Sequence, residues 1–272
     1  MYRQAIAGLF SVWCSLTYSL DIEGKWQQGA LLYGKVAPGE QLEFDGRQVR
    51  ATEDGRFIIG LGRDAGAEAV LQVKGASGEQ RYRYSVLKRQ YAIQRVNGVP
   101  KKTVNPPPEV LERIRHEAAL ARNARKIDSN ISGFLDSFIW PLKGPITGVY
   151  GSQRVYNGQP GRPHYGLDIA APKGTGVVAP ASGVVTLVHD DMYFSGGTLI
   201  IDHGHGLSST FIHLSKILVK PGDDIVQGQA IAEVGATGRA TGPHLDWRMN
   251  WFERRVDPQL LVGGTPESIA SH

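Results

Sequence analysis

The sequence predicts a mostly β protein, with a small N-terminal β-sandwich, one connecting helix and a C-terminal curved antiparallel β-sheet. The chain of 272 residues contains 34 glycines and 15 prolines, a composition that favours turns over long helices. Short strand-like runs bounded by turn residues recur in both halves, and only one segment repeats apolar residues at helical spacing. The length allows one large or two moderate domains.

The first element, residues 1–19, has the features of an export signal. Arg3 precedes an apolar run at 5–16, and Thr17 and Ser19 supply small residues at the positions that determine cleavage. The run is too short for a spanning helix, which needs about 20 apolar residues. We therefore expect a cleaved signal peptide, no stable transmembrane anchor, and export to the periplasm or cell envelope.

Cys14 is the only cysteine of the chain and lies within this signal. We do not expect lipidation, because a lipoprotein signal needs a small residue before its cysteine and Trp13 is large. The mature chain would then offer no thiolate, so any metal must be held by histidine and carboxylate. The net charge of +4 predicts a mild attraction to polyanions. We expect no nucleic acid partner, since no arginine–aromatic stripe is present.

Residues 20–104 predict the β-sandwich, which we interpret as immunoglobulin-like. Turn signals such as Asp45-Gly46 separate the strand-like runs. These runs are 30–34, 41–44, 48–50, 57–60, 69–73 and 81–86. Candidate catalytic residues do not cluster there, so we interpret this part as a spacer or as a docking module for other envelope proteins.

Residues 105–130 predict a helical linker. Asn105 and three prolines break the chain, and apolar residues recur at helical spacing within 109–126. A helical linker is stiffer than a glycine–serine one. We expect its basic residues to form a solvated face.

Residues 131–265 predict the second β domain, and three of its segments carry histidines or carboxylates. His164 and Asp168 are four residues apart, and His244 and Asp246 are two apart. In a strand, such spacings place both side chains on one face. With His213 from a further strand, these groups would form a metal site with bases beside it.

These segments together resemble the M23 (LytM/lysostaphin-type) zinc metallopeptidases, which cut peptide bonds in bacterial cell walls. The resemblance rests on His164-x-x-x-Asp168, on His213 followed by Leu-Ser, and on His244-Leu245-Asp246, and it extends from about 138 to 262. The family pattern ends in HxH, so Asp246 stands where the family has its last histidine.

The resemblance implies one zinc ion, Zn2+, held by His164, Asp168 and Asp246. It also implies that His213 and His244 are the two catalytic histidines that do not bind the metal. One would take a proton from the attacking water, and the other would stabilise the oxyanion or protonate the leaving amine. One histidine and two carboxylates carry a formal charge of −2, so water at this site should be less acidic than with two histidines.

The function implied is that of a zinc-dependent endopeptidase hydrolysing peptide cross-links of peptidoglycan. In a Gram-negative periplasm the target would be D-alanyl-diaminopimelate links. The alternative is a catalytically impaired M23-like protein that binds cell wall or activates another wall hydrolase. The departure at Asp246 favours the alternative, whereas the match at the other four site positions favours the enzyme.

His203 and His205 give a superficial second metal motif. They lie in a glycine-rich turn between two expected strands. We expect a structural role for both.

Overall fold

A computed structural model describes residues 20–76, 78–96, 107–156, 158–264 and 266. The expected signal at 1–19, with Cys14, lies outside the described residues. The architecture is mostly β with one α-helix, as the sequence predicts, and its main feature is a large antiparallel sheet. Among the described residues, none of the helical segments combines the length and hydrophobicity needed to cross a membrane.

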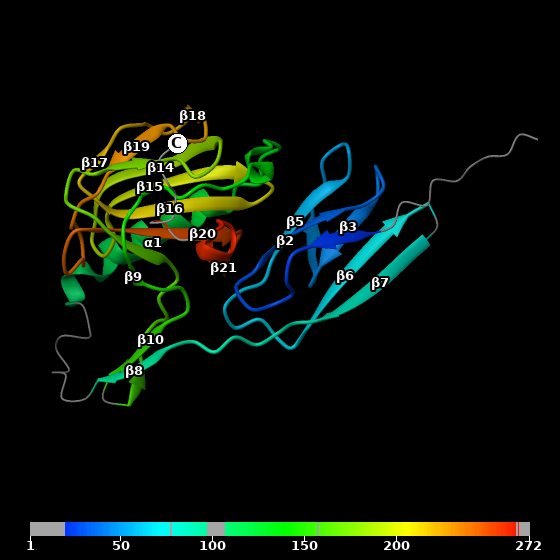
Figure 1. Ribbon diagram of the computed structural model, residues 1–272, viewed down its shortest axis with the longest axis horizontal. Coiled ribbons are helices and arrows are strands. Elements are labelled where there is room, and N and C mark those ends of the chain that lie inside the picture. The colour runs from blue at the N-terminus through cyan, green and yellow to red at the C-terminus, as the bar shows by residue number, and fades with distance from the viewer. Residues whose placement is uncertain (1–19, 77, 97–106, 157, 265, 267–272) are drawn as a thin grey trace, which may run out of the picture.

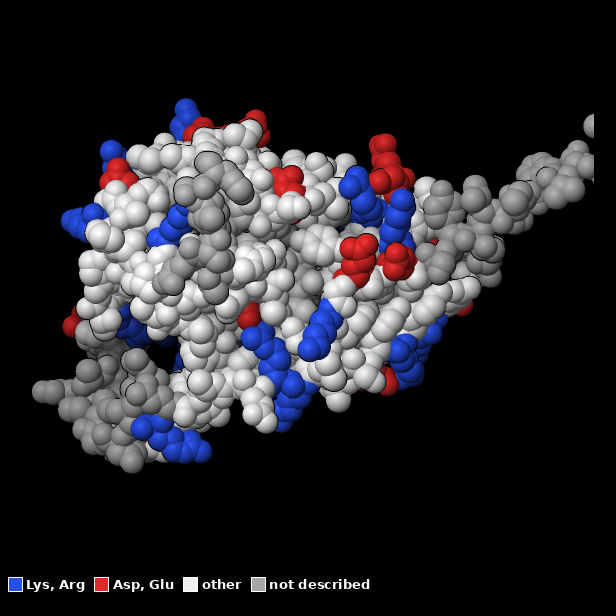
Figure 2. Space-filling view, viewed as in Figure 1, with Lys and Arg blue, Asp and Glu red and all other residues white. Residues whose placement is uncertain are grey.

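The N-terminal module consists of two antiparallel sheets (Figure 1). Buried side chains between them include Leu32, Phe44, Phe57 and Leu71. The first sheet has the order β1-β2-β5, with β1 Asp21–Glu23, β2 Leu31–Lys35 and β5 Arg56–Gly60. The second has the order β4-β3-β6-β7, with β3 Gln41–Phe44, β4 Arg47–Val49, β6 Glu68–Gly75 and β7 Gly78–Ser85. On the face shown in Figure 2, basic side chains lie beside acidic ones over much of this module.

The chain leaves this module through β8 (Ile93–Val96), which pairs in parallel with β10 (Gln153–Tyr156). The short strand β11 (Gln159–Pro160) completes this small sheet. A segment that the sequence assigns to the N-terminal module is therefore paired with the C-terminal part.

The predicted helix consists of a 3-10 turn at Pro108–Val110 and α1 at Leu111–Arg125. It packs on the large sheet, with Ala121 and Ala124 against Ile200. The expectation of a solvated basic face holds for Arg113, which is exposed, and is wrong for Arg125, which is half-buried. Arg113 bonds Asp191 of the sheet, and Arg125 donates to Thr210.

The large sheet has the order β18-β14-β15-β16-β20-β12-β9, with β21 added beside β20, and all of its pairs are antiparallel. Its strands are β9 Ile146–Gly148, β12 Leu167–Ala170, β14 Gly183–Met192, β15 Gly196–Gly204, β16 Leu207–Leu214, β18 Asp224–Ile225, β20 His244–Trp251 and β21 Arg254–Val256. A smaller sheet contains β13 Gly176–Val178, β17 Lys216–Ile217 and β19 Ala230–Glu233. Short 3-10 helices lie at Gly133–Leu135 and Pro258–Leu260.

The two faces of β20 have different chemistry. Its alternate residues Leu245, Trp247, Met249 and Trp251 are fully buried in the core. Because side chains alternate along a strand, the residues between them project from the opposite face. That face carries the predicted site residues, and α1 covers another part of it, since Ile200 lies in register with Thr210 and Thr210 with Arg248.

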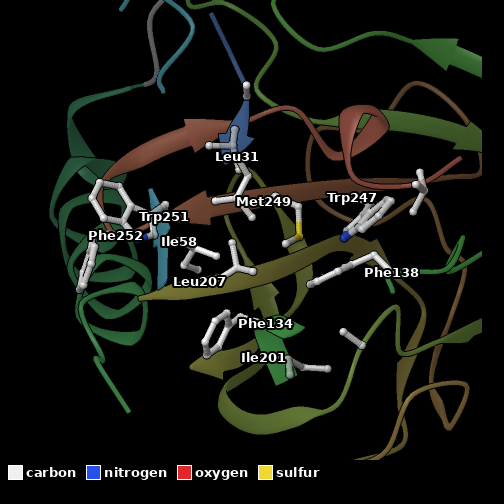
Figure 3. Packing of buried hydrophobic residues seen from close by; sticks show 14 of the residues in the cluster. Leu31, Ile58, Phe134, Phe138, Ile201, Leu207, Trp247, Met249, Trp251 and Phe252 are labelled. Atoms are coloured by element: carbon white, nitrogen blue, oxygen red, sulfur yellow. The ribbon is translucent and has the colours of Figure 1, made fainter. Parts of the chain in front are cut away.

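The N-terminal module shares a hydrophobic core with the large sheet. Figure 3 shows Leu31 and Ile58 of the module in the same cluster of buried side chains as Trp251 and Leu207. Packing is close at Gly60, where an added Cβ would lie 2.6 Å from the Cβ of Trp251. Ion pairs complete this contact, at Asp45–Arg254, Arg47–Glu253 and Arg89–Asp257.

His203 is buried in the core and stabilises the fold in its neutral form. Its Nδ1 lies 2.7 Å from the Ser182 carbonyl oxygen, and its Nε2 lies 2.8 Å from Ser209 Oγ. A carbonyl only accepts, so Nδ1 carries the proton and Nε2 is the acceptor. His205 contacts the Arg50 carbonyl oxygen through Nδ1 at 3.1 Å. Both environments agree with the structural role that we expect.

Burial lowers the pKa of His203 from 6.5 to about 4. The unfolded chain therefore binds this proton first as the pH falls, and the folded state loses stability between about pH 6.5 and pH 4. We expect a loss of about 3 kcal/mol from this group between pH 7 and pH 4. Urea unfolding at both pH values should show a smaller pH dependence for His203→Asn than for the native chain. Equal slopes would show that His203 is not the group responsible.

Candidate metal centre

Three side chains that the sequence predicts as metal ligands lie together on the polar face of the sheet. The nearest ligand atoms of His164, Asp168 and Asp246 all lie within 4.8 Å of one another. Strand register accounts for part of this, because Asp168 of β12 is paired directly with Asp246 of β20. His164 lies just before β12, and its N–H donates to the Ser152 carbonyl oxygen at 2.8 Å. No other such group of His, Cys, Asp and Glu occurs within the described ranges.

Two glycines make room for the carboxylates. A Cβ added at Gly166 would lie 2.0 Å from Asp246 Oδ1, and one at Gly148 would lie 2.2 Å from Asp168 Oδ2. Any larger residue at either position would displace a carboxylate. The backbone therefore approaches the centre closely on both sides.

The donor atoms at this centre fit a zinc ion. His164 Nε2 and Asp168 Oδ1 lie 3.2 Å apart, and each is buried without a hydrogen-bond partner in the described structure. Leaving a buried polar atom unsatisfied costs roughly 1–3 kcal/mol. A cation held between imidazole nitrogen and carboxylate oxygen would satisfy both, and these are donor types that zinc accepts.

Asp246 is held by a partner that the sequence analysis did not identify. Arg248 Nε donates to Asp246 Oδ1 at 2.9 Å, and its Nη2 donates to Oδ2 at 2.5 Å. Burial raises the pKa of the Asp246 carboxyl, but the Arg248 charge outweighs this and holds the pKa below its usual value. A carboxylate has about four lone-pair sites, so each oxygen keeps one for a metal. The position of Arg248, two residues after Asp246 on the same strand face, was a signal available in the sequence.

The two predicted catalytic histidines lie beside this centre with matching orientation. Nδ1 of His213 and of His244 lies 2.8 Å from a backbone carbonyl oxygen, that of Thr237 and of Gly242 respectively. Each Nδ1 must therefore donate, which leaves Nε2 with a free lone pair. The ring centroids are 4.9 Å apart, and His244 Nε2 is 3.9 Å from Asp168 Oδ1. Burial lowers the pKa of His213, so it is neutral at pH 7 and able to accept a proton.

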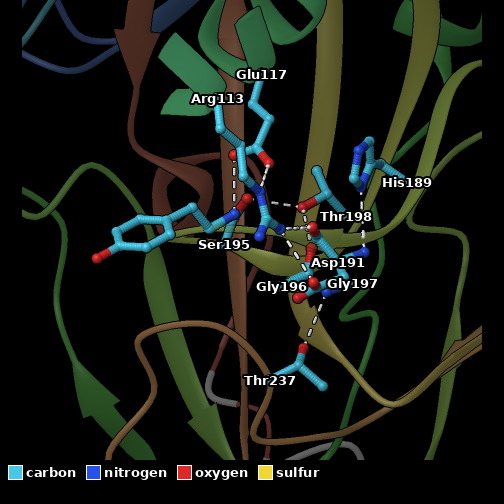
Figure 4. A network of polar contacts seen from close by, with 10 residues as sticks. Arg113, Glu117, His189, Asp191, Ser195, Gly196, Gly197, Thr198 and Thr237 are labelled. Carbon is cyan, nitrogen blue, oxygen red and sulfur yellow. Dashed lines mark hydrogen bonds and ion pairs between the residues drawn. The ribbon is translucent and has the colours of Figure 1, made fainter. Parts of the chain in front are cut away.

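The backbone around His213 is constrained. Its φ of 66° is a left-handed value that is unusual for a residue other than glycine. Its N–H donates to the Ser195 carbonyl oxygen at 2.8 Å, and Thr237 also receives a hydrogen bond from Gly197. These contacts connect β16 to the turn between β14 and β15. Figure 4 shows the bond between Gly197 and Thr237.

The same turn is tied to α1. Glu117 is buried, accepts from Arg113 Nε at 2.6 Å and accepts from the Tyr193 backbone N–H at 2.8 Å. Figure 4 shows this network extending from the helix toward Thr237. The sequence pattern does not indicate that the helix supports a turn next to His213, one of the two predicted catalytic histidines.

The model of peptidase family M23 matches residues 162–258, which include all five site positions. Among solved structures, a candidate M23 peptidase from Pseudomonas aeruginosa is similar over nearly its whole length. It shares 32% sequence identity, with a TM-score of 0.70, and the alignment covers 88% of this chain and 96% of that one.

Curated relatives are similar over shorter parts of their length. An uncharacterised metalloprotease of Haemophilus influenzae is 33% identical over 185 residues, which are 68% of this chain and 34% of that protein. Peptidoglycan DD-endopeptidase ShyA of Vibrio cholerae is 44% identical over 104 residues, which are 38% of this chain and 21% of that protein. The chain thus spans about a third or less of these relatives.

Proposed function

Since the chain belongs to peptidase family M23, we propose that it is a zinc-dependent endopeptidase that hydrolyses peptide cross-links of peptidoglycan. The observation that carries this proposal is the placement of two histidine Nε2 lone pairs beside three converging ligand atoms. The similarity to a peptidoglycan DD-endopeptidase supports the substrate. The periplasm or cell envelope is the proposed place of action, and the N-terminal module is a proposed contact for other envelope proteins.

The site residues would divide into three metal ligands and two residues that transfer protons. His164, Asp168 and Asp246 would hold zinc, which supplies a Lewis acid that activates water and polarises a peptide carbonyl. His213 is neutral at pH 7 and can take the proton from water through Nε2. His244, with its ring 4.9 Å from that of His213, can deliver a proton to the leaving amine when its Nε2 is protonated, and the proton that His213 takes from water balances the one that the amine receives.

One observation favours a second function. Both oxygens of Asp246 already accept hydrogen bonds from Arg248, so the third ligand is shared with a guanidinium. If that pairing prevents zinc binding, the protein binds cell wall or activates another hydrolase without cutting the wall itself. Release of soluble peptides from purified sacculi distinguishes the two functions.

We expect His213→Ala to keep zinc and to lose most of its turnover, because His213 lies beside the centre without being a ligand. Loss of a general base lowers rates by about 100- to 10,000-fold. Sacculus hydrolysis and zinc content by mass spectrometry should be measured together. His116→Ala is the matched control, since His116 is exposed on α1. If native protein binds sacculi but releases nothing, the second function holds. If His213→Ala loses zinc, our role for His213 is wrong.

A further inference from the structure

Three arginines lie on the polar face of the sheet next to the metal centre. Arg248 follows Asp246 on β20, and its register partner Thr210 accepts from Arg125 Nε at 3.4 Å. Arg255 of β21 is the register partner of Asn250 and donates to Asn250 Oδ1 at 3.0 Å. Three guanidinium groups thus lie close together on the polar face of the sheet. They come from β20, from β21 and from the last residue of α1, which contacts β16. We name Arg125 and Arg255 the arginine pair.

The arginine pair has no carboxylate partner among the residues that the structure describes. Asp246 attracts Arg255, but both oxygens of Asp246 are engaged by Arg248. The bonds made by the pair go to a neutral hydroxyl and a neutral amide. Both side chains are half-buried, and charged groups in such positions are normally paired.

The positive charges oppose one another. Burial, followed by the charges of Arg255 and Arg248, lowers the pKa of Arg125 well below its usual value. Burial and the Arg248 charge lower the pKa of Arg255 to about 10. Arginine nevertheless stays protonated in proteins, so this repulsion persists until an anion enters. The fold therefore maintains an unbalanced positive charge beside the centre.

We propose that Arg125 and Arg255 form a subsite that binds a carboxylate of the peptide substrate. The proposal rests on the proposed peptidoglycan function, and it adds that the protein selects stem peptides with free carboxylates over amidated ones. Guanidinium groups recognise carboxylates through two parallel hydrogen bonds. Asn250 is four residues from Asp246 along β20, or about 13 Å at the rise of a strand. An extended peptide bound at the metal centre can span that distance.

In this subsite α1 contributes a residue, Arg125, that contacts the peptide substrate. Arg125 is its last residue and reaches the sheet because Ala121 and Ala124 pack the helix against Ile200. The small alanine side chains bring the helix close to the strands. The helix is thus expected to set substrate preference in addition to connecting the two β parts.

The experiment is a calorimetric titration of the zinc-loaded full chain with a tripeptide, L-alanyl-γ-D-glutamyl-meso-diaminopimelate. This probe has no D-alanyl bond to cut. Two further probes carry an amide in place of the glutamyl carboxylate or of the diaminopimelyl carboxylate that is not joined to D-alanine in the wall, which identifies the carboxylate that is recognised. We expect one amidated probe to bind at least about 10-fold more weakly, as for loss of a charge-assisted hydrogen bond. The Arg125→Gln/Arg255→Gln variant should bind all three probes equally.

Arg122→Gln is the matched control, because Arg122 is exposed on the same helix. Zinc content should be the same in all variants, since the pair makes no hydrogen bond to a ligand residue. If the double variant fails to fold, Arg125→Gln alone replaces it and should lose part of the preference. A native chain that binds the three probes equally, or binds none, overturns the subsite, as does a double variant that keeps the preference.

Sacculus hydrolysis by the native chain keeps the two proposals distinct. Hydrolysis without a carboxylate preference leaves the endopeptidase and removes the subsite. A preference that depends on the arginine pair, without any hydrolysis, supports the subsite in a protein that binds the wall and does not cut it.

Discussion

His164→Ala should lose zinc and hydrolysis together. His164 Nε2 is buried, lies 3.2 Å from Asp168 Oδ1 and has no hydrogen-bond partner in the described structure, so its lone pair is available to a metal. Removing it leaves two carboxylates, one of them already bound to Arg248. Catalytic zinc usually needs three protein ligands. We expect less than about a tenth of the native zinc content and at least about a 1,000-fold loss of activity.

Zinc content by mass spectrometry and sacculus hydrolysis are the two measurements for this variant. His116→Ala, on the exposed face of α1, controls for the loss of an imidazole elsewhere. The variant should remain folded, because His164 lies in a loop before β12 and outside the hydrophobic core. Native zinc content in a folded His164→Ala protein would contradict the ligand assignment.

The clustering of the site residues follows from local spacing within a strand together with the pairing of two distant strands. Alternation along a strand places His244 and Asp246 on one face, and pairing of β12 with β20 then sets Asp168 opposite Asp246. The mostly β fold was also predictable, because short apolar runs between turns require no knowledge of distant contacts. The ligand and catalytic roles of these residues stay predictions until metal and activity are measured.

The contacts of α1 could not be predicted in the same way. Periodicity shows that a helix has an apolar face, and it does not show what that face packs against. The pairing of Arg125 with Thr210 joins residues 85 positions apart in the sequence. The parallel pairing of β8 with β10 is similarly distant and involves strands of only four residues. Such contacts depend on the assembled fold.

Arg248 changes the charge argument for Asp246. From the ligands alone, two carboxylates and one histidine give −2, whereas the family pattern of two histidines and one carboxylate gives −1. The bidentate Arg248 adds one positive charge next to Asp246. The set of four side chains therefore carries −1, as the family's three ligands do. The charge at the centre therefore depends on Asp246 and Arg248 together, because Arg248 neutralises the carboxylate that it bonds.

Asp246→His alone should consequently lose zinc, although it restores the family motif. The substitution leaves the Arg248 guanidinium unpaired beside the centre, and breaking a buried ion pair costs about 3–5 kcal/mol. The four side chains would then carry no net charge. We expect zinc affinity, measured against a competing chelator, to fall at least about 100-fold, which corresponds to about 2.7 kcal/mol.

Arg248→Ala should have the opposite effect on zinc, and the double variant should reveal the coupling. Arg248→Ala leaves a charge of −2, which holds zinc at least as tightly but makes water at the site less acidic and turnover slower. Asp246→His/Arg248→Ala returns to −1 with two histidines, so zinc binding and hydrolysis should both recover.

Native zinc affinity in Asp246→His alone would show that Arg248 is not the counter-charge. If the double variant cuts sacculi and the native chain does not, the natural protein is a wall binder or an activator, and its Asp246–Arg248 pair is what prevents catalysis.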